Sequence, residues 1–287
     1  MSKIIVAYVI AVAVGLAWLL LGPDTGHLWL DTLIADVLAT LVIFAFSRRY
    51  SNSSFYDAYW SVIPPLLLCY WWAVGGLGLA DWRSWAVAVV MFVWAIRLTV
   101  NWIRTFPGLH HEDWRYGMIR DDAGRWAWAA DLFAIHLIPT MQVFLAMLPV
   151  YVALTKPAEG PGWLVVVAFV VGLAAIGLET VSDLQMQRFA RDRQPGEAMD
   201  RGLWAWSRHP NYFGEFGFWV SMCLFGVAAV PADAWWMWVG ALAMLAMFEF
   251  ASIPMMEQRS LERRPEYQSV IDRVPRFVPR PPRSRVG

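Results

Sequence analysis

The string WAWSRHPNYFGE, which ends at Glu215, carries the densest set of groups that could bind a ligand. Pro210 suits the first turn of a helix. Arg208 and His209 would then approach the helix N-terminus, where backbone amides and the helix dipole favour an anion. Asn211 and Glu215 would lie a turn apart on one face. The string predicts a ligand-binding helix start. The alternative is that Arg208 and His209 only mark the membrane interface.

A second set consists of ionisable residues inside apolar runs, where charge is costly and therefore indicates function. Glu179 and Asp183 are four residues apart and would share one helix face. Two carboxylates placed there repel each other unless a ligand or an arginine supplies hydrogen bonds. The alternative to a ligand is an internal ion pair with Arg97 or Arg188.

A third set lies in the polar stretch 101–116. Residues 110–113 read His-His-Glu-Asp and are all types that bind metals, but four adjacent side chains on one loop cannot all face one ion. We therefore expect no metal site. A polar lid over a bound cofactor, held by Arg104 and Arg115, fits the stretch better.

The fourth set surrounds Asp57, which is flanked by Tyr56 and Tyr59. A carboxyl group half-buried among aromatic residues should have a raised pKa and could donate a hydrogen bond to a substrate carbonyl. An ordinary helix N-cap among interfacial aromatics is the alternative.

Long apolar runs must position these groups. Hydrophobic residues make up 59% of the chain and charged residues 16%, against about 45–50% and 25% in soluble proteins. A bilayer core needs about 17–25 apolar residues per helix. We predict an all-α polytopic membrane bundle: one helical domain over 1–274 and a poorly ordered Pro/Arg-rich tail over 275–287. The predicted spans are 4–21, 30–47, 59–79, 83–104, 127–153, 163–186, 212–230 and 234–255.

Basic residues orient this bundle, because Lys and Arg resist translocation. With eight spans and both termini in the cytoplasm, 20 of the 23 basic residues are cytoplasmic, while Arg83 and Lys156 lie outside and Arg97 lies within a span. The long loops 105–126 and 187–211 then share the cytoplasmic face. Arginines gathered there suit a phosphate-bearing ligand or serve topology and lipid head groups alone. Net charge is zero, so the total charge says nothing about a partner. We expect membrane lipids and a lipid-like substrate as partners, and no nucleic acid.

Several of these segments resemble the steroid 5α-reductase family, in its bacterial branch of uncharacterised membrane proteins. The most specific is RHPNYFGE, which also resembles the sterol reductases. The resembling segments are 52–62, 97–102 with 107–116, 182–183 with 194–197, 207–215 and the region 259–279.

The resemblance implies an NADPH-dependent oxidoreductase of the bacterial inner membrane that reduces a polarised carbon–carbon double bond of a lipid-like substrate. Its cofactor pocket would open to the cytoplasm. Asp57 aligns with the acid near the substrate carbonyl; Val90 stands where the steroid enzymes have a carbonyl-polarising tyrosine, so Tyr56 or Tyr59 would replace it. The family typically has seven helices, whereas eight spans are predicted for this chain. With the two residues singled out above, Glu179 and His209, the expected cofactor-binding residues are Asp183, Arg208, Asn211, Tyr212, Glu215, Asn101, Arg104, Arg259 and Tyr267.

Two other functions fit parts of the sequence. A membrane methyltransferase of the isoprenylcysteine carboxyl type shares the Arg-His-Pro-x-Tyr helix start, but S-adenosylmethionine lacks phosphate and needs fewer arginines. A non-catalytic scaffold or lipid-binding protein would use its intramembrane carboxylates as internal pairs. The sequence names neither the substrate nor the oligomeric state.

Overall fold

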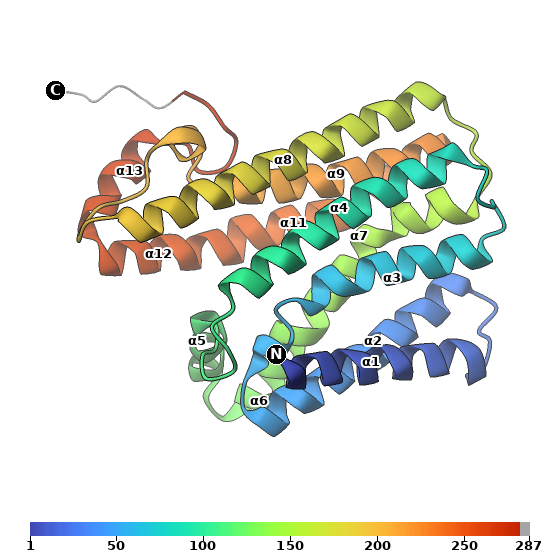
Figure 1. Cartoon of the computed structure of the whole chain (residues 1–287), viewed down its shortest axis with the longest axis horizontal. Helices are drawn as coiled ribbons and strands as arrows, with labels where there is room; N and C mark the ends of the chain where they lie inside the picture. Colours follow the sequence, from blue (N-terminus) through green and yellow to red (C-terminus); the bar gives the residue numbers. More distant parts are fainter. Residues whose placement is uncertain (282–287) are drawn as a thin grey trace. The chain divides into compact units, whose positions relative to one another are not determined.

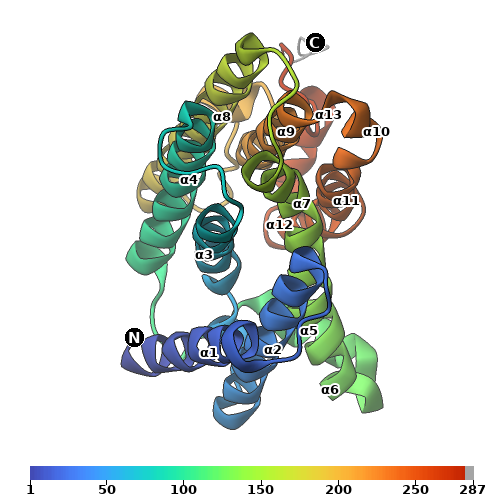
Figure 2. The ribbon, with the colours of Figure 1, turned by 90° about the vertical axis from the view of Figure 1, so that its right-hand side faces the viewer.

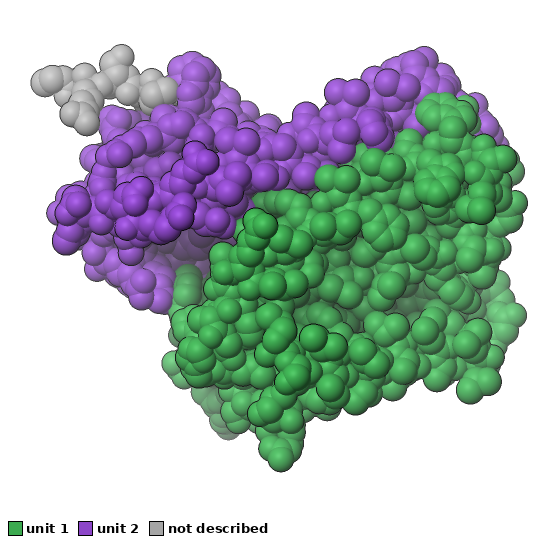
Figure 3. All heavy atoms as spheres, viewed as in Figure 1, with its two compact units in different colours: residues 1–157 green, residues 158–287 purple. Residues whose placement is uncertain are grey.

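The computed structural model describes residues 1–281, and every regular element within them is helical. These residues fall into two compact units, the first Met1–Pro157 and the second beginning at Ala158 (Figure 3). Each unit is described separately below. The single domain expected over 1–274 stays a prediction, and the last part of the expected tail, 282–287, lies outside the described residues.

The predicted membrane bundle is confirmed in its class. Within residues 1–281, seven helical stretches are long and apolar enough to cross a membrane. The predicted span 59–79 is the shorter helix α3 (Tyr59–Val74), whose 16 residues lie near the lower limit of about 17 for a bilayer. The seven stretches are Ser2–Leu21, Leu28–Tyr50, Trp82–Thr105, Trp114–Thr155, Gly162–Asp192, Pro210–Ala229 and Pro231–Arg263.

Helices α1 (Ser2–Leu21) and α2 (Leu28–Tyr50) open the first unit and lie side by side (Figures 1 and 2). Small residues let their backbones approach closely: a Cβ atom at Gly15 would lie 3.3 Å from the carbonyl oxygen of Ala35. Helix α3 packs against α4 (Trp82–Thr105) and α7 (Ile138–Thr155).

The predicted loop 105–126 is largely helical in the structure. Its helix α5 (Trp114–Ala123) begins at Asp113, whose carboxylate caps the first turn by accepting from the Arg115 amide at 2.9 Å. The 3₁₀ turn Gly124–Trp126, the short α6 (Ala127–Ala130) and the π-helical Asp131–Leu137 then lead into α7.

Helix α8 (Gly162–Asp192) dominates the second unit together with α9 (Pro210–Ala229). A Cβ atom at Gly214 of α9 would lie 2.5 Å from the Glu179 side chain, so glycine permits this close packing. Six residues of the predicted loop 187–211 continue α8. The remaining helical elements of this unit are Gly202–Ala205, Pro231–Asp233, α10 (Ala234–Met237), α11 (Val239–Met247), the π-helical Phe248–Ser252, α12 (Ile253–Arg263), Pro265–Tyr267 and α13 (Gln268–Arg273).

Candidate functional site

Arg208 precedes α9, which begins at Pro210 as the sequence predicts. Its guanidinium is buried and held by protein groups. Nε donates to the Glu257 carboxylate at 2.6 Å, and Nη1 donates to the carbonyl oxygens of Ile271 at 2.8 Å and Val274 at 2.9 Å. Arg208 thus ties the start of α9 to α12 and to the end of α13. Its expected contact with a cofactor stays a prediction.

The chain beyond α13 crosses the same helix start. The Arg208 amide donates to the Pro275 carbonyl at 2.9 Å, and the Ser207 hydroxyl donates to the Phe277 carbonyl at 2.7 Å. Phe277 is buried against Phe213. The first part of the expected tail is therefore ordered, because its backbone replaces water as the partner of these donors.

His209 shares the Glu257 carboxylate with Arg208: its Nε2 lies 3.1 Å from Glu257 Oε1. The imidazole stacks on Tyr212, which stacks on Phe248. Burial lowers the pKa of His209, against the opposing influence of Glu257. Nδ1 is buried and has no hydrogen-bond partner among residues 1–281. Burial thus favours the neutral form of the ring, which lies within an aromatic stack.

The carboxylates of α8 face α9. The Asn211 amide donates to Asp183 at 3.4 Å, so the structure brings these two predicted cofactor residues together. Glu179 and Glu215 are both buried, and Glu215 accepts from the Trp219 indole at 2.8 Å.

The last two predicted residues of this unit lie toward its C-terminal end. Arg259 lies on α12, two residues beyond Glu257. Tyr267 ends a 3₁₀ turn, and burial raises its pKa to about 12, with the Glu257 charge acting in the same direction.

A pocket of about 320 Å³ opens at the C-terminal end of α8. Arg201 pairs with Glu197, but Arg188 and Arg193 have no carboxylate at ion-pair distance among the described residues. Burial and the nearby charge of Arg193 lower the pKa of Arg264, which donates to the Glu197 carbonyl. Positive charge is thus left uncompensated here. The lining residues are Gln185, Arg188, Phe189, Asp192, Arg193, Glu197, Met199, Arg201 and Gly202.

In the first unit, Asp57 accepts a hydrogen bond of 2.6 Å from the hydroxyl of Tyr116 on α5. Burial raises the pKa of Asp57 to about 6, while hydrogen bonds from Tyr116 and Ser54 act against that rise. The direction agrees with the sequence argument. The N-cap of α3 is Ala58, so the alternative role of Asp57 as a cap does not hold. Sequence reasoning missed Tyr116 as its partner, because the two are 59 residues apart in the chain.

Tyr56 and Tyr59 have other partners. Both are buried; the Tyr56 hydroxyl lies 2.8 Å from the Thr140 hydroxyl, and Tyr59 donates to the Asp36 carboxyl at 3.2 Å. Neither hydroxyl joins the Asp57 pair, so their roles as replacements for a catalytic tyrosine stay predictions.

The remaining predicted residues of this unit lie at the end of α4. Asn101 is partly buried and Arg104 is exposed. The sequence predicts that Arg104 and Arg115 hold the polar stretch 101–116. Arg115 pairs with Asp113 within that stretch, at 2.8 Å. The cofactor roles of Asn101 and Arg104 stay predictions.

A family model described as "Protein of unknown function (DUF1295)" matches residues 43–274, which is most of the chain. The chain belongs to this DUF1295 family. It is also similar to "Uncharacterized protein C594.04c" of Schizosaccharomyces pombe (strain 972 / ATCC 24843), with 27% identity over 266 residues that cover 83% of this chain and 76% of the yeast protein. No solved structure matches.

The DUF1295 region begins within α2 and ends just after α13. It therefore contains the Asp57–Tyr116 pair, the α8–α9 cluster and the arginine pocket, and it leaves out α1.

Proposed function

We propose that this DUF1295 protein is an NADPH-dependent membrane reductase that transfers hydride to a polarised carbon–carbon double bond of a lipid-like substrate. The proposal rests on the resemblance of its polar segments to the steroid 5α-reductases. One observation carries it furthest: a pocket with uncompensated arginines opens on α8, within two turns of the Asp183–Asn211 pair.

The residues present fit a dinucleotide phosphate. Ligand pockets typically measure about 300–1,000 Å³, and this one lies at the lower end. Guanidinium groups carry the charge opposite to that of phosphate and can donate to two of its oxygens at once. Arg193 is exposed, and its positive charge acts on Arg264, so an anion would relieve the repulsion between them. S-adenosylmethionine carries no phosphate to exploit this charge.

NADPH, when bound, supplies the hydride. We assign its phosphates to Arg188, Arg193 and Arg201, and assign hydroxyl or amide groups of the cofactor to Asp183 and Asn211. Arg208, whose donors already serve protein acceptors, is assigned to holding the C-terminal segment over the start of α9.

The Asp57–Tyr116 pair is assigned to the substrate carbonyl. Reduction of an enone places negative charge on the carbonyl oxygen, and a positioned acid stabilises that charge. A carboxyl group with a pKa of about 6 is protonated in part near neutral pH, so it can donate to that oxygen. Tyr116, which donates to Asp57, holds that carboxyl group in position.

We further propose that α3 crosses the membrane as an eighth span besides the seven stretches above. Both termini and the arginine pocket then lie in the cytoplasm of a bacterial cell, with the protein in its inner membrane. The support is the charge asymmetry: the pocket loop carries basic residues that resist translocation. NADPH is available on that side.

A scaffold or lipid-binding function is the second candidate, and the internal pairing of charges favours it. Arg208 pairs with Glu257, and Glu249 on the membrane-spanning stretch Pro231–Arg263 pairs with Arg276 at 3.4 Å. Such pairs satisfy buried charge without any ligand.

Ligand-induced stabilisation separates these functions, because a ligand that binds only the native state raises its apparent stability. The melting temperature of the purified protein would be measured with NADPH, NADH and S-adenosylmethionine. We expect a rise with NADPH, and a smaller rise in the variant Asp183→Ala. A rise with S-adenosylmethionine alone would reject the reductase in favour of the methyltransferase. No rise with any of the three would contradict the proposal and support the scaffold.

A further inference from the structure

Two segments of the first unit are bonded in a constant register. The short turn 52–57 and the stretch 111–116 are joined by four side-chain hydrogen bonds, and in every one the partners are 59 residues apart. We call these four bonds the polar ladder. Its rungs are Asn52 to the His111 carbonyl (3.0 Å), the Ser53 amide to Glu112 (2.6 Å), the Asp113 amide to the Ser54 hydroxyl (3.3 Å) and Tyr116 to Asp57 (2.6 Å).

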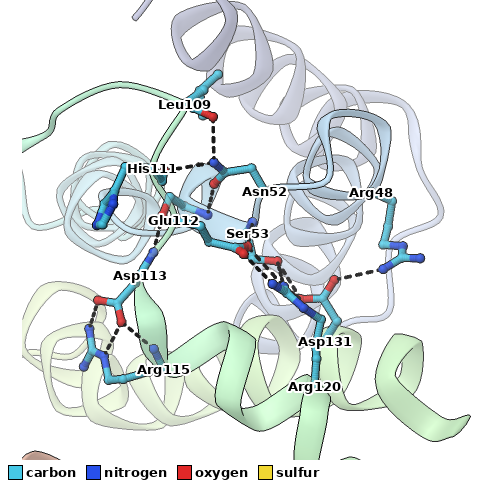
Figure 4. Close-up of polar contacts among 11 residues, drawn as sticks. Arg48, Asn52, Ser53, Leu109, His111, Glu112, Asp113, Arg115, Arg120 and Asp131 are labelled. Carbon is cyan, nitrogen blue, oxygen red and sulfur yellow. Dashed lines mark hydrogen bonds and ion pairs between the residues drawn. The ribbon is translucent and has the colours of Figure 1, made fainter. Parts of the chain in front are cut away.

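Arg120 locks the middle of the ladder (Figure 4). It donates through both terminal nitrogens to the Glu112 carboxylate and through Nη1 to the Ser53 hydroxyl at 3.3 Å. Asp131, almost fully buried, accepts from the same Ser53 hydroxyl at 2.6 Å. Arg120 therefore binds both partners of the second rung, Ser53 and Glu112.

Helix α5 connects the contacts of Arg120 to the last rung of the ladder, Tyr116 to Asp57. Tyr116 and Arg120 are four residues apart on this helix and share one face. Ser53 and Asp57 are likewise four residues apart on the facing turn. A rigid helix held by Arg120 at one rung thus places the Tyr116 hydroxyl at the other.

The facing turn needs such a lock, because it has little regular structure of its own. Only the 3₁₀ turn Ser53–Phe55 lies between α2 and α3. A slip of one residue along a 3₁₀ turn moves a side chain by about 2 Å, which would break the 2.6 Å bond between Tyr116 and Asp57. Bidentate arginine–carboxylate pairs resist such slips, because both bonds must break together.

We infer that Glu112 and Arg120 are positioning residues for the Asp57–Tyr116 pair, and that they act by fixing the register of the polar ladder. The inference rests on the proposed function for its role in catalysis. The positioning itself is a property of the protein alone and can be measured without substrate or cofactor.

The experiment measures how strongly Tyr116 and Asp57 are coupled. The pKa of Asp57 would be followed by infrared titration of the purified protein, with Asp57→Asn to assign the carboxyl band. In the wild-type background, Tyr116→Phe removes a hydrogen bond to the carboxylate and should raise the pKa of Asp57 by about 1. In the background Arg120→Lys, which keeps the charge and loses the bidentate pair, the same Tyr116→Phe change should have little effect.

Glu112→Gln serves as a second background in case Arg120→Lys folds poorly, and it should abolish the coupling as well. Arg125→Gln is the matched control, because it removes a basic residue that contacts Trp126 and takes no part in the ladder. It should leave the full coupling. An unchanged effect of Tyr116→Phe in both Arg120→Lys and Glu112→Gln would overturn the inference. Absence of NADPH binding would instead contradict the reductase and leave this result intact.

Discussion

Two described arginines of the second unit, Arg208 and Arg193, differ in what surrounds them. The Arg208 side chain is 8% exposed, and three protein acceptors bind it. Arg193 is exposed at the pocket and has no carboxylate at ion-pair distance among the described residues. Arg208 belongs to the more specific motif, yet Arg193 has the charge left for a ligand. A motif thus indicates that an arginine matters, while its partners indicate whether it binds the protein or something else.

The substitution with the largest expected effect on stability removes the Arg208 side chain. Arg208→Ala leaves Glu257 partly buried without its main partner and releases the carbonyls of α13. Breaking a buried pair in this way costs about 3–5 kcal/mol. The free energy of unfolding, measured in mixed micelles, should fall by that order.

The matched control is Arg193→Ala, which should change the free energy of unfolding by less than about 0.5 kcal/mol, as exposed substitutions usually do. Equal losses in both variants would remove the distinction between the two kinds of arginine. A small loss in Arg208→Ala alone would show that Glu257 finds another partner.

For NADPH affinity we expect the reverse order: Arg193→Ala should weaken binding more than Arg208→Ala does. Arg193→Ala deletes a phosphate contact under the proposed function, and the loss of one charge-assisted hydrogen bond, about 1.5–3 kcal/mol, weakens affinity roughly tenfold or more. NADH should be affected less if Arg193 binds the 2′-phosphate. Isothermal titration would measure both affinities.

Arg83→Ala is the control here, since Arg83 belongs to the first unit and lies in the first turn of α4. Its affinity for NADPH should equal that of the wild type. If Arg193→Ala also retains full affinity, the pocket is not the phosphate site.

Sequence alone predicted the helical class and most spans, because long apolar runs have few alternatives in a membrane. It placed the start of α9 correctly through Pro210. It also predicted the raised pKa of Asp57, since burial among aromatic residues can be inferred locally.

Contacts between distant segments could not be predicted in the same way. The Tyr116 hydroxyl reaches Asp57, and Glu257 reaches Arg208, across 59 and 49 residues. No local pattern encodes such partners. The order of residues 275–280 was missed for the same reason: their composition is typical of a tail, and only the donors of Ser207 and Arg208 hold them in place.

The smallest expected effect is a change of stability with pH, which depends on His209 beside Arg208. Arginine stays charged across the physiological range, so its charge in the pocket should not respond to mild acid. The Arg208–Glu257–His209 network contains a histidine, whose ordinary pKa of 6.5 lies close to that range. Burial lowers the pKa of His209 below its ordinary value of 6.5, Glu257 opposes this shift, and the charges of Arg208 and Arg276 reinforce it. The unfolded chain therefore binds a proton at a higher pH than the folded protein does, and stability must fall as the pH drops below 6.5.

Melting temperatures between about pH 5 and 8 should decline on the acid side in the wild type and decline less in His209→Gln, which cannot be protonated. A wild-type protein that becomes more stable in acid, with the gain lost in His209→Gln, would mean that protonated His209 pairs with Glu257 strongly enough to outweigh its burial.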